Sequence, residues 1–332
     1  MSTNDTREEH APSSVASKPE LSQEDRSARI AVTVFPLIII AAFALGLIFP
    51  TQAAKLASGV NIGLGIIMFG MGLTLTLPDG ARISVQGKVV LITGAGGLGG
   101  YLARGFAENG ARVVVTDVVP GRAQGLQEKG FACRSYQLDQ TDKAATEAVV
   151  QDIVKAEGRI DALINTAAIA PCHPAEEFPE DELRRVIDIN LTAAVLTSQA
   201  VGRQMIAQQY GKIVNIGSIA GVMCHSYESM PYECTKAAVH QMTKSLACAW
   251  GRYNVNVNAI APTWIMTPML DDCPPEYFEA VDSMHEFGRM SRVEDFFGTA
   301  VYLVTDASNF ISGHVLLVDG GWSTARPVQC KS

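Results

Sequence analysis

The chain has 332 residues, of which 48% are hydrophobic and 18% charged, and its formal net charge is −8. This acidic balance, without a basic stripe and interleaved aromatic side chains, argues against nucleic acid as a partner. The seven cysteines lie at irregular spacings, which is typical of reduced thiols in a cytosolic compartment and not of a disulfide framework.

The N-terminal quarter of the chain differs in composition from the rest. Residues 1–28 are polar, with no apolar period, and we predict a disordered leader there. Residues 29–79 contain two uncharged runs, Ile30–Phe49 and Leu56–Leu77, each long enough to cross a bilayer as a helix. A long leader of mixed charge and a second apolar run argue against a signal peptide or a buried core helix. The sequence therefore predicts a transmembrane helical hairpin that contacts the membrane through residues 30–77.

Charges that flank the hairpin predict its orientation. Arg26 and Arg29 precede the first run, Arg82 and Lys88 follow the second, and the loop between the two runs has only Lys55. By the positive-inside rule, both ends of the hairpin face the cytoplasm. The rest of the chain is then expected to be membrane-associated on the cytoplasmic side, and cytoplasmic if the N-terminal segment is removed.

Three short stretches of the hairpin carry a resemblance to a known family. They are Phe35-Pro36, Phe49-Pro50 and Met68–Leu75. Residues 28–80 thereby resemble the first two spans of a bile acid:sodium symporter-type transporter, a family whose members have many more spans. The resemblance implies a transporter fragment fused to another protein, by evolution or by construction.

After the hairpin, short apolar runs alternate with helical patterns. Lys88–Thr93 is an apolar run that ends in a glycine cluster, Gly94–Gly100, and a helical pattern follows through Ala107. The next run, Arg112–Asp117, ends in an acid about 20 residues after the glycines. Strand, glycine turn and helix are the context that binds a dinucleotide pyrophosphate at a helix N-terminus. The acid lies where a carboxylate accepts hydrogen bonds from an adenosine ribose.

Further strand-like runs continue to the C-terminus, with helix-like segments between them. These runs are Ser135–Leu138, Ala162–Asn165, Lys212–Ile216, Val255–Ile260 and Val315–Val318. Strands that alternate with helices predict a parallel sheet with right-handed crossovers. The predicted fold class is therefore α/β, a doubly wound, Rossmann-type parallel sheet over residues 84–325. The hairpin precedes this domain, and residues 326–332 form a tail.

Tyr232 and Lys236 are candidates for acid/base chemistry. They are four residues apart, so on a helix they lie on one face, one turn from each other. An unperturbed phenol has a pKa of about 10, and a neighbouring positive charge favours the phenolate and lowers that pKa. The pair is therefore expected to exchange a proton with a substrate.

Several short motifs of residues 84–325 occur in a fixed order with this pair. They are Thr93-Gly94, Asp139, Asn165–Ala168, Asn190, Ser218, Tyr232, Lys236, Asn258–Pro262, Thr267-Pro268 and Val318–Gly321. In this order they resemble the short-chain dehydrogenase/reductase family. The resemblance implies hydride transfer between a nicotinamide cofactor and a secondary alcohol or ketone.

The same resemblance implies a role for each of four catalytic residues. Tyr232 exchanges a proton with the substrate oxygen, and Lys236 lowers the pKa of that tyrosine and binds the nicotinamide ribose. Ser218 hydrogen-bonds the substrate oxygen and its developing charge. Asn190 holds a water that links the lysine to solvent.

The cofactor site implied by the resemblance is larger. Its residues are Thr93, Gly94, Gly96, Gly97, Leu98, Gly99, Asp117, Asp139, Asn165, Ala167, Tyr232, Lys236, Pro262, Ile265 and Thr267. The glycine loop has the Thr-Gly-x-x-Gly-x-x-Gly spacing of the family's longer members, one residue shorter than the other usual spacing, and Thr263 stands where the family usually has glycine. A carboxylate at Asp117 repels a 2′-phosphate, so we expect NAD in preference to NADP, although Arg122 is close enough in sequence to soften this preference.

The substrate is indicated only loosely. Cys172, His173, Tyr227 and Trp264 are candidate lining residues, and the segment 266–290 is a candidate lid. Similarity to polyol and gluconate-type members implies a polyol or sugar acid, and the family also implies a homo-oligomer, for which a tetramer is usual.

The sequence leaves two alternative functions open, and it contains two Cys-His pairs of the kind found in metal sites. One alternative is a membrane-tethered nucleotide-binding module without turnover, and another is a transporter fragment fused to a dehydrogenase. Cys172 and Cys224 are each followed by histidine, but no second pair at ligand spacing accompanies either. We therefore expect no metal site.

Overall fold

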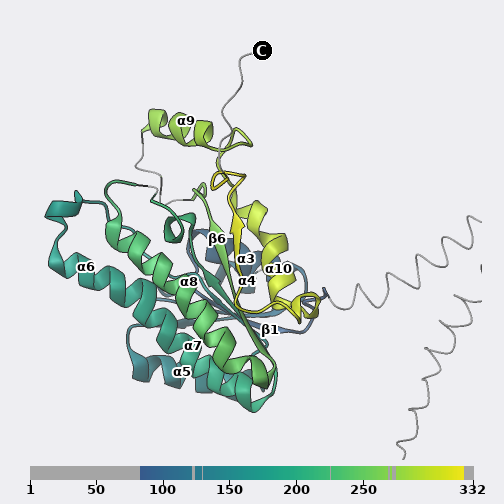
Figure 1. The fold of residues 1–332 in the computed structure, drawn as a ribbon. Helices are drawn as coiled ribbons and strands as arrows, with labels where there is room; N and C mark the ends of the chain where they lie inside the picture. The colour runs from purple at the N-terminus through teal and green to yellow at the C-terminus, as the bar shows by residue number, and fades with distance from the viewer. Residues whose placement is uncertain are drawn as a thin grey trace, which may run out of the picture. The chain divides into compact units, whose positions relative to one another are not determined.

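The computed structural model describes residues 83–121, 124–128, 130–224, 226–267, 270 and 274–324. At the centre is a seven-stranded parallel sheet with the order β3-β2-β1-β4-β5-β6-β7 (Figure 1). The strands are β1 Val89–Thr93, β2 Arg112–Asp117, β3 Cys133–Gln137, β4 Ala162–Asn165, β5 Gly211–Ile216, β6 Val255–Pro262 and β7 Val315–Val318. This order confirms the predicted doubly wound, Rossmann-type fold.

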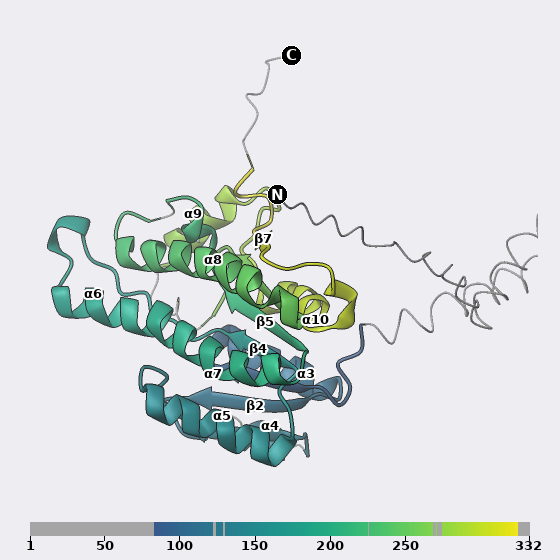
Figure 2. The same ribbon diagram turned by 60° about the horizontal axis from the view of Figure 1, so that its bottom comes forward.

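Helices cover both faces of the sheet (Figures 1 and 2). They are α3 Gly97–Glu108, α4 Gln124–Glu128, α5 Lys143–Glu157, α6 Glu180–Ile187, α7 Ala193–Ala207, α8 Met230–Trp250, α9 Pro275–Met284 and α10 Phe297–Val304. A π-helical turn, η2 (Asp188–Thr192), connects α6 to α7, and a 3₁₀ turn, η3 (Ile219–Gly221), follows β5.

The central strands β1, β4, β5 and β6 are buried along their whole length, because helices cover each face of the sheet. In β1, Val89 and Leu91 belong to a core that includes residues of α5, α7 and α8. Val90 and Ile92 belong to the opposite core, with residues of α3 and α10. Successive side chains of a strand point to opposite faces, so one apolar run supplies both cores.

The edge strand β3 begins and ends earlier than the sequence predicts. It spans Cys133–Gln137 and not Ser135–Leu138, and all its side chains are at least partly exposed. An edge strand that pairs only with β2 has a weak apolar pattern, which explains the shifted boundary. Asp139 consequently lies beyond the end of the strand, in the turn before α5.

The predicted leader, the hairpin over 29–79 and the tail over 326–332 lie outside the described residues. Within residues 83–324, apart from the gaps given above, no helix has both the length and the apolarity to cross a bilayer. The transmembrane hairpin therefore stays a prediction.

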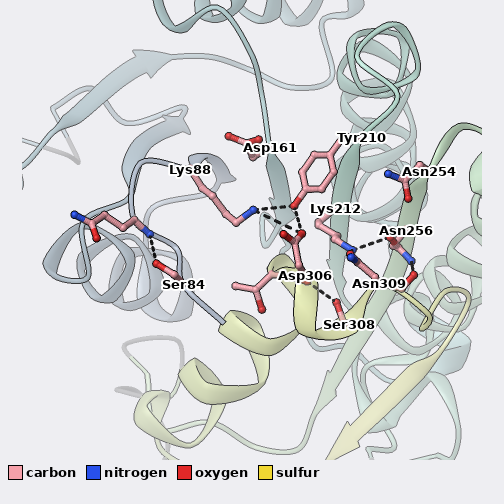
Figure 3. A network of polar contacts seen from close by, with 12 residues as sticks. Ser84, Lys88, Asp161, Tyr210, Lys212, Asn254, Asn256, Asp306, Ser308 and Asn309 are labelled. Atoms are coloured by element: carbon pink, nitrogen blue, oxygen red, sulfur yellow. Dashed lines mark hydrogen bonds and ion pairs between the residues drawn. The ribbon is translucent and has the colours of Figure 1, made fainter. Parts of the chain in front are cut away.

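A polar network lies at the amino ends of the strands, opposite the end where the glycine loop follows β1 (Figure 3). The Nζ of Lys88 donates to the Tyr210 hydroxyl at 2.8 Å, and that hydroxyl donates to Asp306 Oδ1 at 2.8 Å. These bonds connect the start of β1 to the segment between α10 and β7.

Lys212, at the start of β5, is the most deeply buried cation of this network and is 1% exposed. Its Nζ donates to Asn256 Oδ1 at 2.8 Å and to Asn309 Oδ1 at 2.6 Å (Figure 3). Burial lowers the pKa of Lys212 to about 8. The two asparagine oxygens compensate part of the cost of burying this ammonium.

Candidate active site

A cavity of about 1440 Å³ opens at the carboxyl ends of the strands. It lies where the strand order reverses between β1 and β4, the position at which open α/β sheets bind ligands. Fourteen predicted site residues line it, and they are Gly94, Gly96, Gly97, Leu98, Gly99, Asp117, Asp139, Ala167, Ser218, Tyr232, Lys236, Pro262, Ile265 and Thr267. The fold thus gathers residues that are far apart in the sequence around one space.

The start of α3 is built to accept an anion. Its N-cap residue is Gly96, and no side chain caps the helix, so backbone N–H groups are left for a ligand. A Cβ added at Gly96 would meet nothing within 4 Å, which shows open space there. Gly94, by contrast, has φ +75, and a Cβ on it would lie 2.9 Å from the Cα of Ala167. The loop therefore fits the pyrophosphate of a dinucleotide.

Asp117 is held between the glycine loop and the turn after β2. Its Oδ2 accepts the N–H of Ala95 at 2.7 Å, and its Oδ1 accepts the N–H of Val119 at 2.8 Å. A carboxylate has about four lone-pair sites, so acceptor capacity remains for ribose hydroxyls. Arg122 lies outside the described residues.

Asp139 lies on the same wall of the cavity. Its Oδ1 accepts from the hydroxyl of Thr141 at 2.7 Å and from the N–H of Thr141 at 2.9 Å. These two bonds hold the pKa of Asp139 below its usual value. The aspartate is thus kept ionised by the start of the turn that leads to α5.

Thr93, Asn165 and Asn190 differ from the other predicted site residues because they do not line the cavity. Asn165 is buried, and its Nδ2 donates to Ser198 Oγ at 3.0 Å and to Asn215 Oδ1 at 2.8 Å. Thr93 Oγ1 accepts the N–H of the residue after Asn165 at 3.2 Å. Both side chains therefore hydrogen-bond groups behind the cavity wall and do not face into the cavity.

Asn190 connects the π-helical turn to the loop after β4. Its Oδ1 accepts the N–H of Ile169 at 2.8 Å, and its Nδ2 donates to the carbonyl of Ile169 at 2.9 Å. The same amide donates to Thr235 Oγ1, on α8, at 3.3 Å. π-helical turns are frequent at functional sites, and this one directs Asn190 inward.

Ser218 and Tyr232 lie next to each other on the wall of the cavity. Ser218 follows β5 and is hydrogen-bonded to Tyr232, which lies in the first turn of α8. Burial raises the pKa of Tyr232, and the hydrogen bond with Ser218 opposes that rise. Ser218 Oγ also accepts the N–H of Ala220 at 3.1 Å, which leaves its own proton free to donate.

Lys236 lies beneath this pair and is 4% exposed. Its Nζ donates to the carbonyl oxygen of Ile216 at 2.8 Å and is 5.4 Å from the centre of the Tyr232 ring. Burial lowers the pKa of Lys236 to about 8. Burial and the bond with Ser218 are the influences on the Tyr232 phenol that the structure shows, so the expectation that Lys236 lowers this pKa stays a prediction.

Comparison with known proteins agrees with this geometry. The family model described as Enoyl-(Acyl carrier protein) reductase matches residues 94–323. The chain belongs to the short-chain dehydrogenase/reductase family. It is therefore related to oxidoreductases that use a nicotinamide cofactor, and the family expectation drawn from the sequence is confirmed. The likeness to a symporter over residues 28–80 lies outside the matched residues and stays a prediction.

Curated relatives and solved structures show which members of the family it resembles. It is 36% identical over 249 residues to 5-keto-D-gluconate 5-reductase of Escherichia coli (strain K12), which covers 73% of this chain and 98% of the relative. An NAD-dependent glycerol dehydrogenase of Listeria innocua is 36% identical over 243 residues, covering 72% and 95%. A gluconate 5-dehydrogenase from Burkholderia cenocepacia, solved with NADP and tartrate, superposes with TM-score 0.71 at 32% identity, covering 74% and 99%.

The substrate end of this short-chain dehydrogenase/reductase differs in part from the sequence expectation. Cys172 and Trp264 line the cavity, but His173 and Tyr227 do not. Tyr227 is 95% exposed, and His173 Nε2 is 3.1 Å from a carboxylate oxygen of Glu182. The sequence of a loop near a catalytic motif does not show which of its side chains face the cavity and which face solvent.

Helix α9 supplies a lining residue that the sequence did not single out. Tyr277 lines the cavity and packs edge-on against Trp264, with ring centres 5.4 Å apart. Val281 of α9 and Met290, which follows the helix, belong to one buried apolar cluster. Trp264 and Tyr277 pack against this cluster. Pro268 and Cys273, in the predicted lid, lie outside the described residues, and the described part of the lid contains α9.

Thr263 has a structural reason to replace the family's glycine. Its Oγ1 lies 2.9 Å from Nε2 of His285, just after α9, while Nδ1 of His285 lies 2.9 Å from the carbonyl oxygen of Val281. The carbonyl can only accept, so Nδ1 carries the proton and Nε2 accepts from Thr263. The loop after β6 is thereby joined to the lid helix.

Proposed function

We propose that the protein is an NAD-dependent dehydrogenase that interconverts a secondary alcohol and a ketone in a polyol or a sugar acid. One observation carries the proposal. Ser218, Tyr232 and Lys236 meet on the wall of the same cavity as an uncapped helix N-terminus. A nucleotide-binding module without turnover has no need of this catalytic set.

Three side chains of the cavity have separate roles in the proposed reaction. A bound nicotinamide coenzyme would supply the chemistry of hydride transfer to or from the substrate carbon. Tyr232 takes the hydroxyl proton at its phenol oxygen during oxidation and returns it to the carbonyl oxygen during reduction. Ser218 donates to the same substrate oxygen, where negative charge develops. Lys236 is charged below about pH 8 and stabilises the deprotonated phenol.

NAD is proposed over NADP because of Asp117. Its carboxylate is fixed beside the N–H of Ala95, on the part of the cavity wall next to the glycine loop that would face an adenosine ribose. A 2′-phosphate there meets a negative charge that cannot turn away. A glycerol dehydrogenase relative is named as NAD-dependent, whereas the gluconate 5-dehydrogenase structure contains NADP.

A polyol or sugar acid is proposed from two supports. Relatives named for 5-ketogluconate, glycerol and galactitol share about a third of their residues with this chain. The edge-on aromatic pair of Trp264 and Tyr277 offers an apolar part of the cavity lining for the carbon skeleton, and Ser218 and Tyr232 offer hydroxyl groups in the same lining.

The test is coenzyme absorbance at about 340 nm with purified protein. Glycerol, galactitol, gluconate and monofunctional secondary alcohols are each offered with NAD and with NADP, and the matching ketones with the reduced forms. The proposal expects turnover of a polyhydroxy compound with NAD. No turnover with any of them, or turnover of monofunctional alcohols alone, contradicts it.

Two further properties are proposed with this function. We infer that the enzyme works as a homo-oligomer, with a tetramer as the expected form, because this is usual in the family. We also infer that the apolar runs within 30–77 attach the enzyme to a membrane, with the catalytic domain on the cytoplasmic side.

A further inference from the structure

A buried histidine lies next to the catalytic serine. His240 follows Lys236 by one turn of α8 and Tyr232 by two, so the three side chains share one side of the helix. It is 6% exposed. Its Nε2 accepts the backbone N–H of Ser218 at 3.4 Å, which brings α8 into contact with the end of β5. The reaction described above makes no use of this side chain.

The backbone around Ser218 leaves space for this imidazole. A Cβ added at Gly217 would overlap Nε2 of His240, and one added at Gly221 would lie 2.7 Å from its Cε1. The ring also hydrogen-bonds the backbone of Gly221. His240 thus contacts the chain on both sides of Ser218, at positions where only glycine fits.

The charge state of His240 suits an acceptor at Nε2. Burial, and after it the positive charges of Lys236 and Lys244, lower the pKa of His240 to about 4, although the bond to the Gly221 backbone acts in the opposite direction. A neutral imidazole has one donor nitrogen and one acceptor nitrogen. With Nδ1 donating to the carbonyl of Gly221, Nε2 is left to accept from Ser218.

We propose that His240 is a positioning residue that holds Ser218 within hydrogen-bond reach of Tyr232. The inference rests on the proposed oxidoreductase function and goes beyond it, since His240 touches neither cofactor nor substrate. His240 fixes the backbone of Ser218, and the Ser218 hydroxyl opposes the rise in the pKa of Tyr232 that burial causes. Loss of His240 frees the segment 217–221, weakens that hydrogen bond and raises the pKa of the phenol.

Two polar variants of similar bulk give the first test. In His240→Gln the amide oxygen reaches the place of Nε2, whereas in His240→Asn it stops near the place of Nδ1. We expect His240→Asn to lower kcat for alcohol oxidation by about tenfold or more and to move the ascending, acid limb of its pH profile to higher pH, because Tyr232 must be deprotonated to act as the base. His240→Gln should restore most of both. The dissociation constant of NAD should change by less than about twofold in either variant.

Ser218→Ala supplies the second test. It should raise the pKa of Tyr232 in the same way, and combining it with His240→Asn should add no further shift, because both changes act through one hydrogen bond. The matched control is Thr243→Val, in the next turn of α8, which removes the bond from Asn215 Nδ2 to Thr243 Oγ1. This control should lower stability and leave the pH profile unchanged.

Ionisation of Tyr232 can also be followed without turnover. The ultraviolet difference spectrum between each protein and its Tyr232→Phe counterpart reports the titration of this one phenol. A shift in His240→Asn but not in His240→Gln supports the inference even if no substrate is turned over, an outcome that defeats only the proposed function. The positioning role of His240 is overturned if His240→Asn leaves the pKa of Tyr232 unchanged. It is also overturned if the pKa shift in His240→Asn adds fully to the shift in Ser218→Ala.

Discussion

The ammonium of Lys236 lies 5.4 Å from the centre of the Tyr232 ring, and its hydrogen bond goes to the carbonyl of Ile216. The lysine is therefore fixed by the end of β5 and not by the phenol it is expected to serve. The partner that contacts Tyr232 directly is Ser218. This arrangement separates two tasks, because Ser218 adjusts the phenol while Lys236 supplies charge below it.

Tyr232→Phe should lower kcat by about 10²–10⁴-fold, the range of general acid/base catalysis. The phenylalanine ring fills the same space, and only the transferable proton is lost. The dissociation constant of NAD, measured by fluorescence titration, should therefore stay within about twofold of the unmutated value. Near-native kcat on a confirmed substrate would show that another group performs the proton transfer.

Lys236→Met should damage both steps in which this lysine is expected to act. We predict a fall in kcat of about 10²-fold or more, because the buried positive charge that favours the phenolate is gone. NAD should bind about tenfold more weakly, because the bond to the nicotinamide ribose is lost. Steady-state rates and a binding titration measure the two effects separately, and a loss of rate with unchanged NAD binding would remove the ribose role.

The sequence predicts those features of this protein that leave a local pattern, and it does not predict those that depend on tertiary packing. Ala162–Asn165 is predicted to the residue because a strand buried on both faces has an uninterrupted apolar run. The glycine loop and the Tyr232–Lys236 pair are equally visible, since backbone geometry and helical spacing leave local patterns. Tyr277 and His240 are not visible, because each reaches the site through tertiary packing of a helix with an ordinary amphipathic pattern.

Asp117→Ser should narrow the preference for NAD over NADP by about tenfold in kcat/KM. A carboxylate fixed by the N–H groups of Ala95 and Val119 cannot turn away from a 2′-phosphate, and serine removes that repulsion. Part of the change should appear as weaker NAD binding, because serine accepts fewer ribose hydrogen bonds. Equal kcat/KM for both coenzymes in the unmutated enzyme would refute the assignment.

Lys212→Met tests the buried cation at the amino ends of the strands. The pKa of Lys212 is lowered to about 8 in the folded protein, below its value of 10.5 in the unfolded chain. Between these two pH values the unfolded chain binds the proton more strongly, so the contribution of Lys212 to stability rises with pH. Unmutated protein should therefore gain stability relative to Lys212→Met between pH 7 and pH 9.5 (about one and a half units above the folded pKa) in urea unfolding. A relative loss over that interval would contradict the assigned direction of the shift.

The last prediction concerns the apolar N-terminal segment. A chain that begins at Arg82 should be soluble, fold, and bind NAD as tightly as the full chain does in detergent. The reason is that, among the residues the structure describes, both cores of the sheet begin at Val85 or later and the lining of the cavity begins at Gly94. The full chain should sediment with membranes, because its two uncharged runs are each long enough to span a bilayer. Protease added to sealed inside-out vesicles should then digest the catalytic domain, whereas right-side-out vesicles should protect it. A truncated chain that is insoluble or fails to bind NAD would instead mean that the apolar segment packs onto the dehydrogenase, and so would a full chain that is soluble without detergent.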